Sequence, residues 1–528
     1  SFNEYSSLDA YENMGKRMTY AELEEKSKVF ASYLQNDLGM QPGDRLAIQM
    51  PNILQSPVVL FGAIRAGLTV VNTNPLYTPS EMKHQFNDSG AKAVVILANF
   101  ASNLEEILPE TKIEHVIVTQ LGDMLGGLKG GIVSFVVKYI KKMVPSYHLP
   151  NAIPFKTAMA KGDSATYNKP SIGSEHTAFL QYTGGTTGVS KGAMLTHRNI
   201  IANLQQVSEW MATSSLEKGK EVFITALPLY HIFALTVNAF VCAKLGAKSV
   251  LITNPRDMKG FIKELGKHPY TFITGVNTLF NGMLSTPGFA QVDHSNLKVA
   301  IAGGMALQRF VAEKWEQVTG VTVAEGYGLT ETSPVLCVNP LNAARIGSIG
   351  LPVPSTDIVM LDDDGNEVPY GEPGELCAKG PQVMKGYWER PEETKKCFNG
   401  EYFKTGDIAI QEPDGFIRIV DRKKEMILVS GFNVYPNEVE DCIASMEKVA
   451  EVGAIAVPDE KSTESVKVYI VKADDSLTEE EVKAHCHEHL TGYKRPKYVA
   501  FTDELPKSNV GKILRRILKE NDLKENSY

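Results

Sequence analysis

The sequence predicts an α/β protein with a large N-terminal domain of doubly wound sheets, a β-rich subdomain, and a small α+β domain at the C-terminus. Three changes of pattern along its 528 residues predict this arrangement. Helical and strand patterns alternate over residues 16–100 and again from 176 to about 340, and short strands broken by Gly, Pro and Asp follow over 346–420. A compact mixture of strands and capped helices fills the rest. The boundary is expected between Val420 and Asp421, which gives domains of residues 1–420 and 421–528.

The first elements show the rhythm of a doubly wound sheet. Thr19 and Glu22 have the spacing of a capping box, at the start of a helix expected to reach about Asn36. A short strand is expected over 44–49 and a helix over 55–66. The apolar, branched runs at 68–71 and 93–97 are typical of buried parallel strands.

Residues 129–144 predict an amphipathic helix. Residues 133, 136, 137, 140 and 144 would form its apolar face, with Lys138, Lys141 and Lys142 opposite. Two interpretations remain open: a helix that lies on an anionic membrane surface, and a surface helix packed on the core. The prolines between residues 145 and 175 predict an irregular connection.

A second apolar stretch, residues 222–243, contains no Asp, Glu, Lys or Arg and is long enough to span a bilayer. Pro228, Tyr230 and His231 lie in its middle, where a spanning helix needs an unbroken hydrogen-bond ladder. We therefore expect a buried strand, a turn and a buried helix. Further helices are expected over 198–211, from Ser476 and over 512–520, with strands over 451–457 and 466–471.

The composition excludes several classes of protein. Hydrophobic residues make up 43% and charged residues 22%, as in soluble globular proteins. The net charge of −8 argues against a nucleic-acid binder. The six cysteines are scattered without a C-x-x-C pair, which fits a reducing compartment and argues against a disulfide scaffold or a zinc ribbon.

The glycine-rich loop QYTGGTTGVSKGA, residues 181–193, predicts a phosphate-binding site. Its small residues let backbone amides approach phosphate oxygens, its hydroxyls donate to them, and Lys191 adds positive charge. A Walker loop is excluded because Gly192, not Ser or Thr, follows Lys191. A hydrolase remains an alternative, because GVSKG fits the G-x-S-x-G elbow with Ser190 as nucleophile.

Five further motifs follow in order: PLYHIF from Pro228, YGLTET from Tyr327, TGD from Thr405, DRKK from Asp421 and PKSNVGK from Pro506. Together with the loop they resemble the adenylate-forming enzymes, a superfamily of acyl- and aryl-CoA ligases, peptide-synthetase adenylation domains and luciferases. The resemblance covers nearly the whole chain and is strongest to the bacterial long-chain fatty-acid–CoA ligases. It implies a mobile C-terminal domain that turns about a hinge at Asp421.

The resemblance also implies roles for individual residues. Lys512 matches the lysine needed for adenylation, His231 borders the carboxylate substrate, Thr330 contacts the α-phosphate, and Glu331 is the magnesium ligand. Gly303, Gly304 and Tyr327 match the adenine pocket, Asp407 and Arg422 the ribose site, Lys424 a further nucleotide contact, and Gly431 the path of the pantetheine arm. The implied phosphate loop consists of Tyr182, Thr183, Gly184, Gly185, Thr186, Thr187, Gly188 and Lys191.

This resemblance implies an enzyme that uses ATP and Mg²⁺ to join a medium- or long-chain fatty acid to coenzyme A through an acyl-adenylate. An aryl-CoA ligase is the alternative within the superfamily. Ser190 stands where many relatives have proline, which argues against the hydrolase. The expected location is cytoplasmic, with peripheral contact with the inner face of the membrane, and the oligomeric state stays open.

Overall fold

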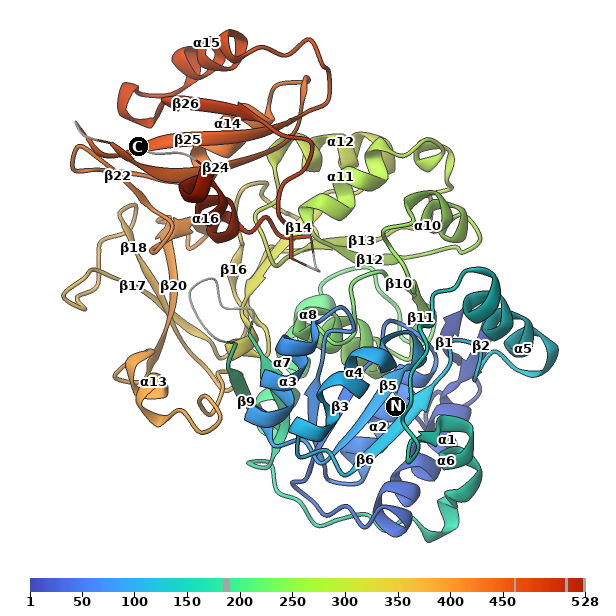
Figure 1. Cartoon of the computed structure of the whole chain (residues 1–528). Coiled ribbons are helices and arrows are strands. Elements are labelled where there is room, and N and C mark those ends of the chain that lie inside the picture. Colours follow the sequence, from blue (N-terminus) through green and yellow to red (C-terminus); the bar gives the residue numbers. More distant parts are fainter. Residues whose placement is uncertain (184–189, 460–461, 509–510, 526–528) are drawn as a thin grey trace.

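The computed structural model describes residues 1–183, 190–459, 462–508 and 511–525. Figure 1 shows a large body of sheets and helices, with the C-terminal segment above it as a separate lobe. The α/β class and the large and small parts predicted from the sequence are confirmed.

The first sheet has seven strands in the order β7-β6-β5-β3-β4-β8-β9. Its neighbours pair in parallel except β8 and β9, which form an antiparallel hairpin. The strands are β3 (Arg45–Gln49), β4 (Thr69–Asn72), β5 (Ala93–Leu97), β6 (His115–Thr119), β7 (Ile153–Pro154), β8 (Thr177–Tyr182) and β9 (Gly192–Thr196).

The second sheet has nine strands in the order β16-β15-β14-β13-β12-β10-β11-β1-β2, and its centre is parallel. In chain order the strands are β1 (Asp9–Asn13), β2 (Lys16–Thr19), β10 (Val222–Thr225), β11 (Lys248–Leu251), β12 (Phe272–Gly275), β13 (Val299–Ala302), β14 (Val323–Gly328), β15 (Val335–Val338) and β16 (Leu351–Pro352). Many side chains of both sheets and of the helices that cover them are fully buried and contact one another. The two sheets and their helices therefore share one large hydrophobic core.

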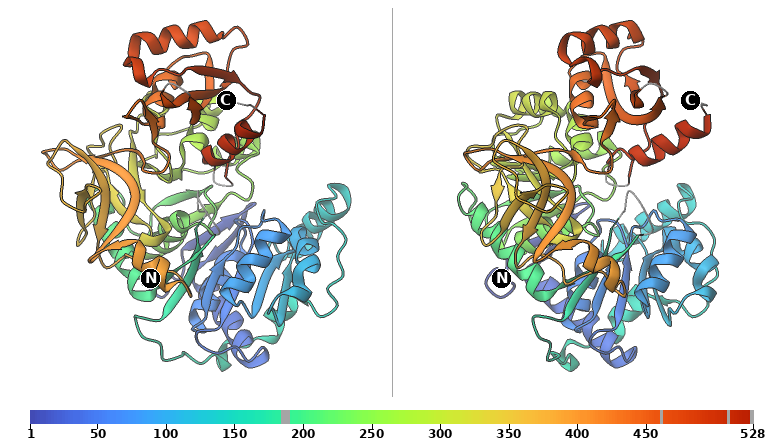
Figure 2. Two further views of the ribbon diagram at one scale, coloured as in Figure 1. Left: turned by 60° about the vertical axis from the view of Figure 1, so that its left-hand side comes forward. Right: turned by 90° about the vertical axis from the view of Figure 1, so that its left-hand side faces the viewer.

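Helices connect and cover these two sheets (Figures 1 and 2). The longer ones are α1 (Tyr20–Ser32), α2 (Gln55–Arg65), α3 (Pro79–Ser89), α4 (Ala101–Ile107), α5 (Gly127–Phe135), α6 (Phe155–Lys161), α7 (His197–Met211), α10 (Met258–Leu265), α11 (Asn277–Ser285) and α12 (Arg309–Thr319). Shorter turns are α8 (Ile232–Ala234), α9 (Cys242–Leu245), η1 (Tyr33–Asp37), η2 (Ala98–Phe100), η3 (Leu108–Glu110), η4 (Val136–Ile140), η5 (Ser164–Thr166), η6 (Leu235–Val241), η7 (Phe289–Gln291) and η8 (Thr330–Thr332).

The β-rich part is an antiparallel sheet of β17 (Asp357–Leu361), β18 (Pro373–Lys379), β19 (Phe398–Asn399), β20 (Tyr402–Gln411) and β21 (Ile417–Arg422), with α13 (Pro391–Lys396) at its side. The C-terminal lobe has a core of its own. Its strands are β22 (Ile427–Val429), β23 (Phe432–Val434), β24 (Val449–Asp459), β25 (Thr463–Lys472) and β26 (Tyr498–Phe501), and its helices are α14 (Pro436–Ala444), α15 (Glu479–His489), η9 (Gly492–Lys494) and α16 (Arg515–Glu525).

Most expected elements are confirmed. Thr19 and Glu22 form the capping box of α1, and residues 222–243 form β10, a turn and the buried helical run from α8 to α9. No helix in the described part of the chain is long and apolar enough to cross a membrane.

Three expectations were wrong. Residues 145–175 are not irregular throughout, because Pro154 fixes an extended backbone at the end of β7 and α6 follows directly. The last helix begins at Arg515 rather than at residue 512, because the backbone of Lys512 bonds to Ser508 instead of entering the helix. The expected 129–144 helix is shorter and starts earlier, because α5 begins at Gly127 and η4 ends at Ile140. Four residues of its expected apolar face, 133, 136, 137 and 144, are half-buried as expected, but Ile140 is 65% exposed.

Candidate active site

The expected phosphate loop connects the two antiparallel strands β8 and β9. Tyr182 ends β8, and its hydroxyl donates to Asp88 at 2.7 Å. The backbone N–H of Thr183 donates to the carbonyl of Lys191 at 3.0 Å, which closes the base of the loop. Gly184, Gly185, Thr186, Thr187 and Gly188 lie outside the described residues.

Ser190 has a structural partner at the base of this loop. Its hydroxyl donates to the carbonyl of Thr183 at 2.6 Å, and an imidazole nitrogen of His84 lies 2.9 Å from the carbonyl of Ser190. A nucleophile elbow connects a strand to a helix, whereas this loop connects two strands of a hairpin. The local fold therefore argues against the hydrolase alternative.

Lys191 contacts a segment that the sequence interpretation overlooked. Its ammonium pairs with Glu393 of α13 at 2.9 Å and lies 4.4 Å from the ring centre of Tyr387. The same tyrosine donates its hydroxyl to Glu331 at 2.7 Å. Tyr387 therefore contacts two expected site residues: its ring faces Lys191, and its hydroxyl bonds to Glu331.

Thr330 and Glu331 belong to the short turn η8, which follows the end of β14. Glu331 is 9% exposed. Among the described residues its carboxylate accepts only the hydrogen bond from Tyr387. A buried carboxylate with remaining lone pairs suits a cation that takes one protein ligand and completes its shell with phosphate oxygens and water. In the described part of the chain, no group of three acidic, His or Cys residues could hold a metal by itself.

Tyr327, Asp407 and Arg422 form a second connected group. The Tyr327 hydroxyl donates to one oxygen of Asp407 at 2.6 Å, and the Arg422 guanidinium lies 3.3 Å from the other. β20 and β21 place Asp407 directly opposite Arg422 in register. Burial and the neighbouring Asp407 carboxylate raise the pKa of Tyr327 well above its usual value, so its hydroxyl stays a donor.

Gly303 and Gly304 follow the end of β13, beside this group. A side chain at Gly303 would come within 3.1 Å of the Phe233 ring and 3.2 Å of the Gly326 carbonyl. Gly304 has a φ of +79°, which glycine adopts without strain. A side chain at Gly303 would crowd its neighbours, whereas Gly304 is exposed.

His231 and Lys512 are brought together from the two parts of the chain. His231 caps α8, with a ring nitrogen 3.4 Å from the N–H of Phe233. Burial and the nearby Lys512 ammonium lower the pKa of His231 to about 4, so it is neutral at pH 7. Burial, and next the Arg422 guanidinium, lower the pKa of Lys512 to about 8.

Asp421 lies in β21 and connects the β-rich part to the C-terminal lobe. Its carboxylate accepts the N–H of Asn437 at 2.8 Å and pairs with Arg515 at 3.1 Å. Burial raises the pKa of Asp421 to about 6. These contacts tie the start of α14 and the start of α16 to one residue.

Two further expected residues follow β21 in the chain. Lys424 lies in the turn after β21. Gly431 lies between β22 and β23 with a φ of +85°, and in the described structure a side chain there would meet nothing within 4 Å. Next to it, Phe432 is 56% exposed and stacks on Tyr493 at 4.8 Å.

Comparison with known proteins identifies the class. The family model of the AMP-binding enzyme matches residues 2–388, and that of the AMP-binding enzyme C-terminal domain matches residues 438–512. The chain belongs to the AMP-binding enzyme family.

Within this family the chain is similar to long-chain-fatty-acid–CoA ligases. The ligase of Escherichia coli O6:H1 is 57% identical over 517 residues, which cover 98% of this chain and 92% of that protein. Among solved structures, ATP-bound MatB from Rhodopseudomonas palustris has a TM-score of 0.85 at 28% identity and covers 99% of this chain and 98% of its own. The structure of apo MatB has a TM-score of 0.75 at 29% identity, and the match covers 97% of this chain and 95% of MatB. The arrangement of this chain is therefore closer to the ATP-bound state of MatB.

Proposed function

We propose that this protein joins medium- or long-chain fatty acids to coenzyme A in two steps. The carboxylate first attacks the α-phosphorus of ATP and releases pyrophosphate, and the thiol of coenzyme A then attacks the acyl-adenylate and releases AMP. The observation that carries this proposal is the position of Lys512, half-buried where the two parts of the chain meet and close enough to His231, Asp407 and Arg422 to interact with them electrostatically.

The first step brings two anions together, so it needs positive charge and fixed positions rather than proton transfer. In this proposal residues 182–188, with Lys191, hold the β- and γ-phosphates and Thr330 contacts the α-phosphate. Gly303, Gly304 and Tyr327 border the adenine, Asp407 binds the ribose hydroxyls with Arg422 at its side, and Lys424 adds a nucleotide contact. His231 lines the carboxylate site as a neutral side chain.

Magnesium fits this site through Glu331. Its buried carboxylate, oriented by Tyr387, would hold the ion, which supplies positive charge to the phosphates when bound. Lys512 would lie between the carboxylate and the α-phosphate in the first step. Because it would block the thiol in the second, the C-terminal domain, residues 421–528, would turn about Asp421 and bring the Gly431 segment to the site.

The fatty-acid substrate rests on the relatives, whose names specify long-chain fatty acids. The test is AMP release with ATP, magnesium and coenzyme A across acetate, octanoate, palmitate, oleate and a cinnamate-type acid. Release that needs both coenzyme A and a long chain is expected. Release with the aryl acid alone would support the two-step ligation but contradict the fatty-acid substrate. No release with any acid would overturn the proposal.

We also propose that this enzyme works in the cytoplasm, in contact with the inner face of the membrane. Six of the fifteen large hydrophobic side chains exposed in the described structure lie on α5 and η4 or directly after them: Leu128, Ile132, Phe135, Tyr139, Ile140 and Met143. Residues 124–162 contain six lysines and no Asp or Glu. An apolar face on a segment with an excess of lysines suits an anionic bilayer surface.

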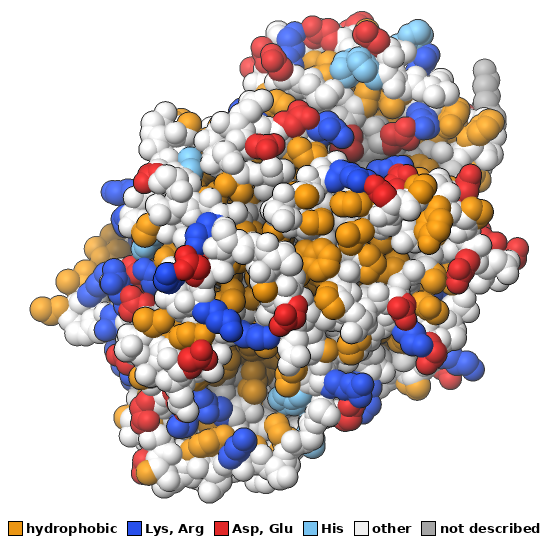
Figure 3. All heavy atoms as spheres, turned by 180° about the vertical axis from the view of Figure 1, so that it is seen from behind, with side chains coloured by type: hydrophobic (Ala, Val, Ile, Leu, Met, Phe, Trp, Pro, Cys, Tyr) orange, Lys and Arg blue, Asp and Glu red, His pale blue; other side chains and the backbone are white. Residues whose placement is uncertain are grey.

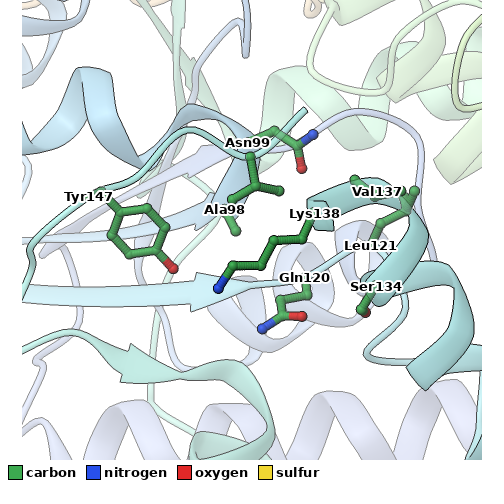
Figure 4. Close-up of a pocket in the computed structure, with 9 residues that line it drawn as sticks. Ala98, Asn99, Gln120, Leu121, Ser134, Val137, Lys138 and Tyr147 are labelled. Atoms are coloured by element: carbon green, nitrogen blue, oxygen red, sulfur yellow. The ribbon is translucent and has the colours of Figure 1, made fainter. Parts of the chain in front are cut away.

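The shape of the molecule supports this contact. α5 projects from the body, where hydrophobic and basic side chains gather at the left edge of Figure 3. The inner side of this helical segment covers a small pocket beyond β5 and β6, and Val137, Lys138 and Ser134 face that pocket (Figure 4). The helical segment is therefore anchored on one side and leaves its other apolar side uncovered.

A further inference from the structure

Residues 384–393 follow β18, include the first turn of α13, and lie along the edge of the phosphate-loop hairpin. Their backbone pairs with β9: the N–H of Met194 donates to Gly386 at 2.8 Å, and the N–H groups of Lys385 and Trp388 donate to Met194 at 3.0 Å and Gly192 at 2.8 Å. We call this segment the brace. It extends the first sheet by backbone bonds that do not depend on its side chains.

The brace also holds the turn that carries Glu331. The N–H of Met384 donates to the backbone carbonyl of Glu331 at 2.7 Å. Three residues later, Tyr387 donates its hydroxyl to the Glu331 carboxylate, also at 2.7 Å. Glu331 is therefore fixed at both its backbone and its side chain by one segment.

Tyr387 holds Lys191 from the same position. The Lys191 ammonium lies 4.4 Å from the centre of the ring, within the range of a cation–π interaction. Tyr387 is 8% exposed, and the Lys191 side chain keeps 30% of its surface exposed, so the contact is partly shielded from water. The hydroxyl and the ring of one side chain thus serve two different groups of the site.

Ion pairs at the end of the brace add a second connection to the loop. Glu393 pairs with Lys191 at 2.9 Å, and Arg390 pairs with Asp88 at 2.8 Å. Asp88 in turn accepts the hydroxyl of Tyr182 at the other end of the loop. Both ends of the phosphate loop are therefore joined to the brace.

We propose that Tyr387 is a positioning residue for the ATP site, where its hydroxyl orients Glu331 for the metal ion and its ring holds Lys191 for the phosphates. The brace supplies the rigid backbone that this double role requires. This inference rests on the proposed function, since it assigns Glu331 and Lys191 to magnesium and phosphate. A group that orients a metal ligand through a hydrogen bond commonly changes metal affinity 10- to 100-fold when it is removed.

Two substitutions of Tyr387 separate its two roles. Tyr387→Phe removes the hydroxyl and keeps the ring, whereas Tyr387→Leu removes both. We expect the Kd of Mn²⁺ for the enzyme–ATP complex, measured from the free Mn²⁺ signal by electron paramagnetic resonance, to rise about tenfold or more in both variants. Binding of ATP without metal should weaken only in Tyr387→Leu, by about two- to fivefold.

Tyr469→Phe is the matched control. Its hydroxyl also donates to a carboxylate, that of Asp522, within the C-terminal lobe and away from this site. It should leave the Mn²⁺ affinity unchanged. In a Glu331→Gln background, Tyr387→Phe should have no further effect on Mn²⁺ binding, because the carboxylate that it orients is gone.

Equal Mn²⁺ affinity in wild type and Tyr387→Phe would overturn the inference, as would the same loss in Tyr469→Phe. An undiminished effect in the Glu331→Gln background would also overturn it, because the hydroxyl would then act elsewhere. A wild-type protein that binds no Mn²⁺ with ATP and forms no acyl-adenylate would instead overturn the proposed function.

Discussion

Lys512 shows how the tertiary structure changes the properties of a single residue. A solvated lysine keeps its charge far above neutral pH, but burial and the Arg422 guanidinium lower the pKa of Lys512 to about 8. At pH 7 it still carries its proton. A half-buried ammonium such as that of Lys512 interacts more strongly with an incoming anion than a fully exposed one.

Lys512→Ala should separate the two half-reactions. Adenylate formation should fall by about 10²- to 10³-fold or more, because a charge that stabilises the transition state is lost. Conversion of preformed acyl-AMP to thioester should persist, and both rates can be followed with purified acyl-AMP. Lys507→Ala is the control, because Lys507 lies in the same segment and pairs with Glu451. Equal loss of both steps in Lys512→Ala would contradict the assigned role.

The same lysine predicts a pH dependence. Its charge is present below pH 8 and is lost as the pH rises through that value. kcat/KM for adenylation should therefore fall on the alkaline side with an apparent pKa of about 8, since this parameter reports the free enzyme. The thioester step should instead rise with pH, because a thiolate is the nucleophile. Pyrophosphate and AMP release measured between pH 6 and 10 would show it, and a flat adenylation profile would count against Lys512.

At the scale of elements, α5 and η4 are apolar on more than one side. The sequence pattern identified a face that contained residues 133, 136 and 137, and these are half-buried against the body. The structure leaves a second set of apolar side chains outside, including Leu128 at 87% exposure. Exposed apolar patches of this kind mark interaction sites in soluble proteins.

Ile132→Glu and Phe135→Glu should weaken binding to anionic vesicles. Each removes a side chain that is more than half exposed and adds a charge that an anionic bilayer repels. We expect a roughly tenfold lower partition into vesicles with phosphatidylglycerol, measured by cosedimentation, and unchanged turnover of a short, soluble acid. Tyr370→Glu, at a 67% exposed site in the β-rich part, is the control. Unchanged cosedimentation of both helix variants would refute the membrane contact.

At the scale of the whole molecule, the site exists only where the two parts of the chain meet. Acidic groups lie at this junction. Asp441 on α14 remains exposed, yet the protein around it removes part of its water and raises its pKa to about 7, with Glu440 and Asp421 adding to the shift and Arg515 and Arg309 opposing it. Burial likewise raises the pKa of Glu325 on β14 to about 7, and Asp441 adds to that shift. In this arrangement the two carboxyls therefore keep their protons up to a higher pH than isolated carboxyls do.

These raised pKa values determine how the closed arrangement of the two parts depends on pH. Both carboxyls have a raised pKa, so the closed arrangement is favoured at low pH and weakens as the pH rises from about 4 to about 7. Energy transfer between dyes on the two parts should fall between pH 5 and 8, and Asp441→Asn should reduce this change. A closed fraction independent of pH would contradict the prediction.

How far the sequence could predict this molecule depended on the distance between interacting residues. The capping box of Thr19 and Glu22 and the strand at 93–97 were predictable, because caps and apolar runs act within a few residues. The contact of Tyr387 with Glu331 and Lys191 was not, because it joins residues 56 and nearly 200 positions apart. The only signal for Tyr387 was its place in a mixed-charge segment before Pro391.

The sequence by itself determined the α/β class, the order of the motifs, and the residue types that can meet phosphate, ribose and a carboxylate. These follow from local patterns and from the chemistry of single side chains. The tertiary structure alone decided that Lys512 reaches His231, which side of α5 stays bare, and that the brace joins Lys191 to Glu331. Burial and packing between distant segments control these features, and no local pattern records which segments will pack together.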